Sequence, residues 1–403
     1  MIMQPHDVWP PHELLSEMAH ASFDYLNKRQ DISIKDGSGI IAQFEDCLIQ
    51  YYGVQHALVL NSGTSAVYSA LYSVGIQEDD EVICQTSTFH ASITPLLQCG
   101  GIPVLCETDG VTGNIDIQDL NRKITNKTKA IILTHMWGYP ADMDLIMEIA
   151  EHNNLYVIED CSHAHGTIYK GKKVGTIGHI GVFSMQGSKL VPAGEGGYLI
   201  TSNTNLYERA MLLSQFGERL RVQIKNPDIH KLWETGLGLK NRIHPLSAVC
   251  AITAFNRFEN YLERRRRRIR SFHEFIKDIP ALNHIIEESS DDRYSYFMNR
   301  IHYNSELNFG IPINTVVKEL RLYGLDIRIS SHKPLYCLPL FKEKISAIKS
   351  NNYTRWPTYN QTQFPKTTRY FESLLGVPCF DHPDGDKLVE DYGRIIHSYF
   401  QLR

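Results

Sequence analysis

The sequence predicts an α/β fold: a large domain with a mainly parallel central sheet, followed by a smaller α+β domain. Short apolar runs without alternation, such as "HALVLN" and "LYVIED", are typical of parallel strands that are covered on both faces. Helical patterns such as "DMDLIMEIAEHN" separate these runs, as they do in α/β proteins. After residue 280 the pattern changes to strand-like pieces, a proline-rich loop and a last helix. We therefore expect two domains, residues 1–260 and residues 261–403.

The first two predicted elements are helices. "PPHELLSEMAHASFDYL" opens with proline and repeats apolar residues at helical spacing. "SGIIAQFEDCLIQYYG" has Ser38 as an N-cap and Gly53 as a stop. The strand-like runs that follow are "HALVLN", "DEVICQTS", "IPVLCE", "KAIILTHMW", "LYVIED", "GHIGVF" and "YLIT".

A long helix is expected from about Pro245, and it contains the run "ERRRRRIR". Most of these arginines fall off the apolar stripe of the helix, so we expect them on its solvated face. The formal net charge of −4 also lacks the basic excess that sequence-independent nucleic-acid binding needs. We therefore expect no nucleic-acid partner. Strand-like "YSYFMNRIHY" and "GLDIRIS" and a last helix, "KLVEDYGRIIHSYF", complete the smaller domain.

The cysteines indicate the compartment. Eight are scattered along the chain without a Cys-x-x-Cys pair, which predicts free thiols in a reducing environment. The start of the sequence has no basic segment followed by an apolar one, and no apolar run approaches the roughly 20 residues that span a bilayer. We expect a cytoplasmic protein without a membrane partner.

The stretch "LVLNSGTSAVYSAL" predicts an anion site. A strand ends in Asn-Ser-Gly-Thr-Ser and turns directly into a helix, and Gly63 allows the tight turn. The unpaired amides at the helix start, with the positive end of the helix dipole, can hold a phosphate. The alternative is that Ser62 or Thr64 only caps the helix. The Walker A and Gly-x-Gly-x-x-Gly patterns are absent.

The stretch "NLYVIEDCSHAHG" places Asp160 at the end of a buried strand, where α/β sheets bind their ligands. A carboxylate there can keep a heterocyclic nitrogen protonated, or it can simply cap the next turn. Cys161, His163 and His165 alternate, so a zinc site is an alternative. They lack the spacing of structural zinc sites, and we expect no metal.

The stretch "FSMQGSKLVPAGEGG" places Lys189 among small residues, and burial there favours the neutral, nucleophilic amine. An anion site, an acid for a ring nitrogen and an amine for an aldehyde are the parts that pyridoxal 5′-phosphate requires. Phe89, after the next strand, can stack on the ring. Along the sequence, the anion site, the aromatic ring, the acid and the lysine come in the same order as in fold type I enzymes that use this cofactor.

The sequence resembles the DegT/StrS family of pyridoxal-phosphate-dependent aminotransferases, which act on keto sugars and ketocyclitols. The resemblance covers nearly the whole chain. Its motifs are "GSGIIAQFE", "NSGTSAVYSAL", "TFHAS", "GIPVLCETD", "NIDIQDLNRKITNKTKAIILTHMWGYPADMD", "VIEDCSHAHGTIYKGKKVG", "FSMQGSKLVPAGEGG" and the late "LLGVPCF".

The resemblance implies a role for each site residue. Lys189 holds the cofactor as a Schiff base and moves the proton between substrate and cofactor. Asp160 pairs with the pyridine nitrogen, and Phe89 stacks on the ring. The residues that hold the phosphate are Gly63, Thr64 and Ser184.

Two positions depart from the family pattern. His163 stands where the family often has a glutamine that touches the ring hydroxyl, so its charge state becomes a variable. Lys240 stands where an asparagine of the family reaches the phosphate of the partner subunit. Lysine suits a phosphate as a point charge, but the neighbouring Asn241 can take the role through a shift in register. The family's active sites lie at a dimer interface, so a homodimer with shared sites is implied.

The leading hypothesis is an aminotransferase that moves the amine of glutamate or glutamine to a keto sugar or ketocyclitol. A dehydratase is the first alternative, and Lys189 weighs against it because dehydrating relatives carry histidine there. Relatives that aromatise a cyclic ketone keep the lysine, so Lys189 does not weigh against that activity. A non-catalytic cofactor-binding regulator is the second alternative.

Overall fold

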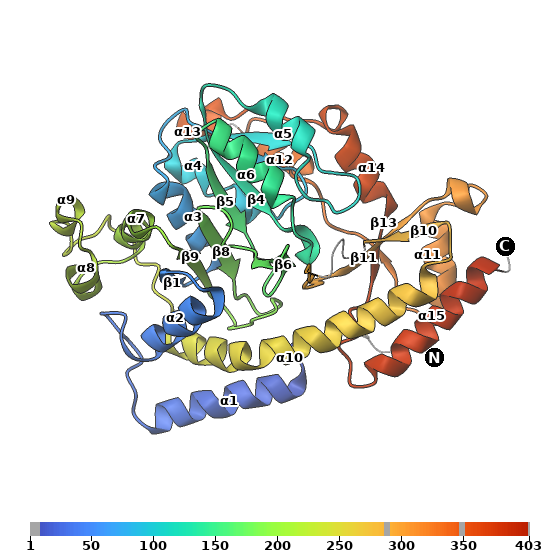
Figure 1. Ribbon diagram of the computed structural model, residues 1–403, viewed down its shortest axis with the longest axis horizontal. Helices are drawn as coiled ribbons and strands as arrows, with labels where there is room; N and C mark the ends of the chain where they lie inside the picture. Colours follow the sequence, from blue (N-terminus) through green and yellow to red (C-terminus); the bar gives the residue numbers. More distant parts are fainter. Residues whose placement is uncertain (1–8, 286–290, 346–350, 402–403) are drawn as a thin grey trace.

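The computed structural model describes residues 9–285, 291–345 and 351–401. A seven-stranded sheet with the order β1-β9-β8-β5-β4-β2-β3 forms its centre (Figure 1). The predicted α/β fold is confirmed. The strands are β1 (His56–Leu60), β2 (Glu81–Gln85), β3 (Ile102–Cys106), β4 (Thr128–Thr134), β5 (Tyr156–Asp160), β8 (Ile180–Ser184) and β9 (Gly197–Thr201). A short hairpin, β6 (Ile168–Tyr169) and β7 (Lys172–Lys173), stands apart.

Six of the seven strands point the same way. β3, β2, β4, β5 and β8 pair in parallel, and β9 runs antiparallel to both β8 and β1. β1 therefore has the direction of the parallel strands, and all six carboxyl ends meet at one edge. In open α/β sheets this edge is where ligands bind.

Helices cover both faces of the sheet and bury its apolar residues. One face packs on α3 (Gly63–Ser73) and α7 (Thr204–Ser214). The other packs on α2 (Gly39–Tyr52), α5 (Ile117–Lys123), α6 (Met143–His152) and the start of α10 (Pro245–Ile276). The shorter helices are α4 (Leu96–Cys99), α8 (Glu218–Gln223), α9 (Pro227–His230), α12 (Pro339–Lys342), α13 (Asn351–Arg355) and α14 (Pro365–Ser373).

A second, antiparallel sheet follows, with the order β10-β11-β13-β12. Its strands are β10 (Leu282–His284), β11 (Asn299–Tyr303), β12 (Arg328–Ile329) and β13 (Leu374–Val377), and it packs with α11 (Ile313–Leu322) and α15 (Gly385–Gln401). The chain between β12 and β13 returns to the large sheet, where Trp356 and Phe364 join its core. The division at residue 260 stays a prediction, because α10 runs through that point without a break.

The long helix α10 connects the two parts of the molecule (Figure 1). It packs against α1 (His12–Asn27) near its start and against α15 near its end. Our expectation for its arginine run was wrong: Arg265, Arg266 and Arg268 are buried, whereas Arg267 is 64% exposed. The contacts that bury them come from distant loops, which the periodicity of one helix does not reveal.

Each buried arginine of α10 has specific acceptors. Arg265 forms a bidentate pair with Asp381, and Arg266 donates to the carbonyl oxygens of Tyr294 and Gly166. Arg268 donates to the carbonyl oxygen of Phe380 at 2.7 Å. These side chains satisfy backbone groups that would otherwise be buried without partners.

The described helices include none that combines the length and the apolar character needed to cross a membrane.

Replacing Arg268 by methionine is expected to lower the free energy of unfolding by about 2–3 kcal/mol, because buried carbonyl oxygens of residues 380 and 382 lose their donor. Arg267→Met is the matched control: it removes a neighbouring, exposed arginine that also pairs with Asp386, and its effect should stay within about 0.5 kcal/mol. Denaturant-induced unfolding measures both. Equal effects of the two substitutions would show that the buried contacts of Arg268 do not contribute.

Candidate active site

A cavity of about 630 Å³ lies at the carboxyl edge of the large sheet. Seven of the eight residues predicted for the site line it: Gly63, Thr64, Phe89, Asp160, His163, Ser184 and Lys189. Its other wall comes from the region of the small sheet and includes Phe297, Met298 and Arg300. The topology explains the meeting of residues so distant in sequence, since they follow β1, β2, β5 and β8, whose ends share one edge.

The anion cradle is built at the start of α3. The Oγ of Ser62 caps the helix by accepting from the amide of Ser65 at 3.1 Å. Gly63 lies against Ser184: a Cβ on Gly63 would come within 2.7 Å of the Ser184 Cβ. The amides of Gly63 and Thr64 belong to the first helical turn, whose N–H groups have no partner inside the helix. A serine hydroxyl and helix amides together suit a phosphate.

Asp160 is fixed by hydroxyl groups and a backbone amide. It is 4% exposed, accepts from Ser92 through one oxygen, and accepts from the amide of Ser162 at 3.0 Å through the other. Ser92 belongs to a network in which the hydroxyl of Thr88 contacts both Ser92 (2.8 Å) and Thr134 (2.6 Å). These contacts hold the carboxylate in one orientation at the end of β5.

Lys189 lies in the loop between β8 and β9, and its Nζ is 4.5 Å from the centroid of the Phe297 ring. Burial lowers the pKa of its ammonium group to about 8, against a smaller opposing effect of Asp160. The loop is held by a hydrogen bond of 2.8 Å from the indole of Trp9 to the carbonyl oxygen of Lys189. A substantial fraction of this amine is therefore neutral near pH 8, as a nucleophile requires.

His163 stands in an aromatic stack that the sequence did not reveal. Its ring stacks on Phe297 (centroids 4.3 Å apart) and on Trp137 (5.6 Å). Burial, and then the charges of Lys189 and other cationic groups, hold the pKa of His163 well below its usual range. Its Nδ1 is buried without a partner among the described residues. The variable charge expected for His163 is thus resolved in favour of a neutral ring with one unused polar atom.

Several residues of the cavity were not predicted from the sequence. Trp137 follows β4 in "KAIILTHMW", so its position after a strand end could have marked it. Phe297 and Arg300 lie in a segment of the small sheet that carries no recognisable motif. Only the folded chain brings that segment to the large sheet.

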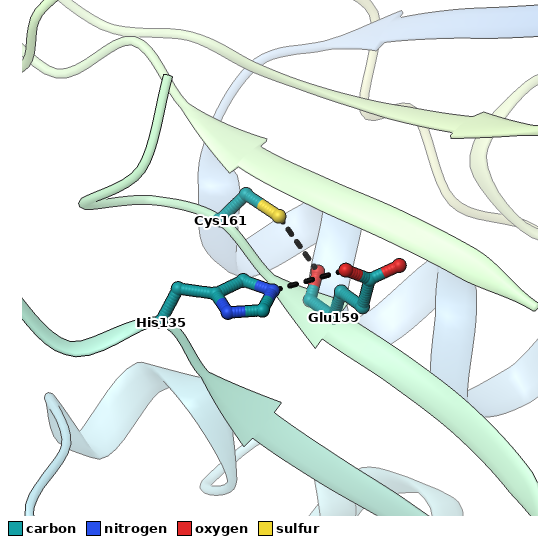
Figure 2. Close-up of side chains that lie close together, drawn as sticks. All are labelled: His135, Glu159 and Cys161. Carbon is teal, nitrogen blue, oxygen red and sulfur yellow. Dashed lines mark hydrogen bonds and ion pairs between the residues drawn. The ribbon is translucent and has the colours of Figure 1, made fainter. Parts of the chain in front are cut away.

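The structure does not bring Cys161, His163 and His165 together as a zinc site. His163 lies in the aromatic stack and His165 packs against the rings of Phe183 and Tyr198, so neither joins Cys161. Among the described residues, Cys161 instead approaches His135 and Glu159, and the three ligand atoms lie within 4.8 Å of one another (Figure 2).

The contacts of this cluster assign it a structural role. The Nδ1 of His135 accepts from the amide of Ala141, so its Nε2 carries the proton and donates to Glu159 at 3.0 Å. Burial raises the pKa of the Cys161 thiol well above its usual value, which disfavours the thiolate that binds metals. Glu159 also accepts three backbone N–H groups, those of residues 175, 177 and 178.

Lys240 does not line the cavity. It is exposed, and the next residue, Asn241, accepts from the amide of Asn61 at 2.8 Å, close to the cradle. Its predicted contact is with a second subunit, so its role stays a prediction.

Comparison with known proteins decides the family. A sequence profile of the DegT/DnrJ/EryC1/StrS aminotransferase family matches residues 29–389. The chain belongs to this family. It is 32% identical over 346 residues to the GDP-perosamine synthase of Escherichia coli O157:H7. The match covers 85% of this chain and 90% of the relative. The resemblance inferred from the motifs is confirmed.

One further relative and one solved structure are informative. The chain is 37% identical over 194 residues to the L-glutamine:2-deoxy-scyllo-inosose aminotransferase of Streptomyces lividus, and the match covers 48% of this chain and 46% of the relative. The structure of the aminotransferase from Psychrobacter cryohalolentis superimposes with a TM-score of 0.84 at 26% identity and covers 99% of both chains. The protein is therefore an aminotransferase that depends on pyridoxal phosphate.

The cavity fits this family cofactor. The cradle beside Ser184 suits its phosphate, and the space there exists because Gly63 has no Cβ. Asp160 offers a fixed carboxylate for the ring nitrogen, and the unpartnered Nδ1 of His163 is a polar atom available for the ring. Lys189 supplies an amine of lowered pKa for the aldehyde.

The reaction of the cofactor-free protein with pyridoxal phosphate is expected to accelerate with pH, with a midpoint of about 8, because only the neutral form of Lys189 attacks the aldehyde. Asp160→Asn should move the midpoint below 8, since the carboxylate favours the ammonium form. Glu195→Gln removes a charge from the same cavity and should leave the midpoint in place. Stopped-flow absorbance measures the profile, and an unchanged midpoint in Asp160→Asn would contradict this account.

Gly63→Ala is expected to weaken the binding of pyridoxal phosphate by about 10-fold or more, since the added methyl group would overlap Ser184 and distort the cradle. The binding of pyridoxal, which lacks the phosphate, should change far less. Gly110→Ala adds a methyl group where nothing lies within 4 Å and is the matched control. Equilibrium titration of the cofactor-free protein separates these effects. Equal losses for the two aldehydes would exclude a phosphate cradle at Gly63.

Proposed function

We propose that the protein transfers the amino group of glutamate or glutamine to a keto group of a sugar, nucleotide-linked or phosphorylated, or of a ketocyclitol. The product would serve amino-sugar, polysaccharide or antibiotic biosynthesis. The observation that carries the proposal is the half-buried Lys189 amine of lowered pKa, which lines the same cavity as the anion cradle and the fixed Asp160.

Each residue of the site has a distinct role in this proposal. Gly63, Thr64 and Ser184 bind the phosphate of the cofactor, and Asp160 holds a proton at its ring nitrogen. His163, kept neutral by its surroundings, donates or accepts one hydrogen bond at the ring without adding charge. Phe89, 54% exposed at the mouth, has room to settle on the face of the ring.

Lys189 has two tasks, attachment and proton transfer. When bound, pyridoxal phosphate supplies an aldehyde and an electron-withdrawing ring that accepts the electron pair of the bond broken at the amine-bearing carbon. The Nζ of Lys189 would take the proton from the amine-bearing carbon of the donor and hold it for transfer to the cofactor. A pKa of about 8 suits both directions of this transfer near neutral pH.

Two relatives support an acceptor of the sugar or cyclitol class. One is named as a GDP-perosamine synthase, and the other as an aminotransferase that acts on 2-deoxy-scyllo-inosose with L-glutamine. Aromatic side chains line the wall near Lys189, among them Trp137 and Phe297. Such rings form flat apolar surfaces that suit the face of a cyclic substrate.

The proposal includes a homodimer in the cytoplasm. Lys240 is exposed near the cradle, where a second subunit could receive it, and apolar Leu232 and Leu237 are exposed at 38% and 40% in the preceding segment. All eight cysteines are free thiols, as a reducing compartment favours. Sedimentation equilibrium of the holoenzyme measures the oligomeric state.

The decisive experiment has two stages. L-glutamate or L-glutamine, added to the holoenzyme alone, should convert the cofactor to its aminated form, which is followed by absorbance. A panel of keto sugar nucleotides, keto sugar phosphates and inososes should then restore the original spectrum, and mass spectrometry should detect a product with an amine in place of oxygen.

Lys189→Ala should lose both stages of this assay. A holoenzyme that consumes a keto sugar without forming an aminated product would support a dehydratase instead. Absence of any spectral change with both donors would support a non-catalytic binder.

A further inference from the structure

Trp9, which stands ahead of α1, contacts the loop that carries Lys189. Its indole Nε1 donates to the carbonyl oxygen of Lys189 at 2.8 Å, across 180 positions of the sequence. The matched family profile begins at residue 29, so Trp9 precedes the region that carries the family motifs. The lysine loop is therefore bonded to a segment that none of those motifs connects to the site.

The loop between β8 and β9 has few ties of its own. Backbone hydrogen bonds close its base. At its tip, the amide of Lys189 donates to the carbonyl oxygen of Gln186, and Ser188 donates to the side chain of Gln186. Among the described residues, Trp9 is the one hydrogen-bond partner that reaches residues 187–192 from outside the loop. The position of the Lys189 backbone therefore depends on this indole.

Trp9 is itself held in place by α10. Its ring meets that of Tyr261 at 82°, with the centroids 5.6 Å apart. The guanidinium group of Arg265 is centred 5.0 Å from the centroid of the larger indole contact surface, the Trp9 ring, and a bidentate pair with Asp381 fixes that guanidinium. The indole N–H is thus oriented by groups that do not belong to the lysine loop.

Apolar packing supports the loop beyond the lysine. Val191 belongs to a buried cluster that α1 and α10 complete, through Leu14, Met18, Phe258 and Leu262. This packing acts two residues after Lys189, whereas the hydrogen bond of Trp9 acts at the lysine itself. Removing the indole N–H alone should therefore release the lysine backbone without detaching the loop from the two helices.

We propose that Trp9 is a positioning residue for Lys189, whose backbone it fixes so that the amine stays at one place in the cavity. The inference rests on the roles proposed for that amine, attachment and proton transfer. Both require it within reach of a defined atom, and the flexible four-carbon stem of lysine gives little guidance by itself. Trp9 lines the adjoining cavity of about 530 Å³ and not the one that Lys189 lines, so it acts through the lysine.

Trp9→Phe tests the proposal, because it keeps an aromatic ring against Tyr261 and Arg265 but removes the N–H. In the cofactor-free protein, deuterium exchange of the amides in the Lys189 loop should become faster, as mass spectrometry measures. Attachment of pyridoxal phosphate, followed by stopped-flow absorbance well above pH 8, where the amine is neutral, should slow about 3- to 10-fold. This is the range for one neutral hydrogen bond.

Trp356→Phe is the matched control. The indole of Trp356 also donates to a backbone carbonyl oxygen, that of Gly101 at 2.9 Å, but in the core of the large sheet. This substitution should lower the melting temperature and leave loop exchange and the attachment rate as they are. Tyr261→Leu keeps the Trp9 indole but removes the ring that orients it. It should give a smaller effect of the same kind, and it covers the case in which Trp9→Phe does not fold.

The holoenzyme provides a second readout in its reaction with L-glutamate alone. Trp9→Phe should lower the maximal rate of cofactor conversion about 3- to 10-fold, while the glutamate concentration for half of that rate changes less than about 2-fold. The isotope effect with α-deuterated L-glutamate should increase, because breaking the C–H bond depends on the placement of the Lys189 amine. A purely structural role of Trp9 would not change this isotope effect.

The proposal fails if Trp9→Phe behaves like Trp356→Phe, with a lower melting temperature but unchanged loop exchange, attachment rate and isotope effect. It also fails if glutamate binding weakens while the maximal rate stays the same. Failure of the proposed function looks different: the wild-type holoenzyme would react with neither L-glutamate nor L-glutamine, whereas loop exchange and cofactor attachment would still report on Trp9.

Discussion

The buried carboxylate of Glu159 organises the edge of the sheet on which the site depends. It accepts from His135, which follows β4, and from backbone amides of the loop that leads into β8. One side chain of β5 thereby joins the segment after β4 to the loop that precedes β8. Asp160 is the next residue of β5, so the acid of the site directly follows this fixed position. With all its neighbours donating, the charge is buried without leaving an acceptor unsatisfied.

Charged side chains away from bulk water belong to two groups in this protein. Glu45 forms a buried pair with Arg219, as Asp381 does with Arg265, and such pairs complete the fold. Lys189 and Arg300 are half-buried and line the cavity, and no acidic side chain of the described residues is bonded to them. Their charged groups are therefore accessible from the cavity.

The sequence was sufficient for the parts of the site that are local. Gly63, Asp160 and Lys189 each follow a strong strand pattern, and in a parallel sheet strand ends converge whatever the rest of the chain does. Arg300 and Phe297 could not be found in this way, since they reach the cavity through an antiparallel sheet with short strands and no motif. The arginines of α10 were misplaced for a related reason: their acceptors lie outside the helix, 28 to 116 residues away in the sequence, and helical periodicity carries no information about them.

The hydrogen bond from Trp9 to the carbonyl of Lys189 gives the molecule an internal optical probe. The chain has four tryptophans, and two of them, Trp9 and Trp137, lie beside the lysine loop or in the cavity wall. Bound pyridoxal phosphate absorbs light in the range where indoles emit, so loading of the cofactor quenches fluorescence at the loop that carries it. The filling of the site can thus be read from the ultraviolet emission of the unlabelled protein, without a coupled assay or a known acceptor.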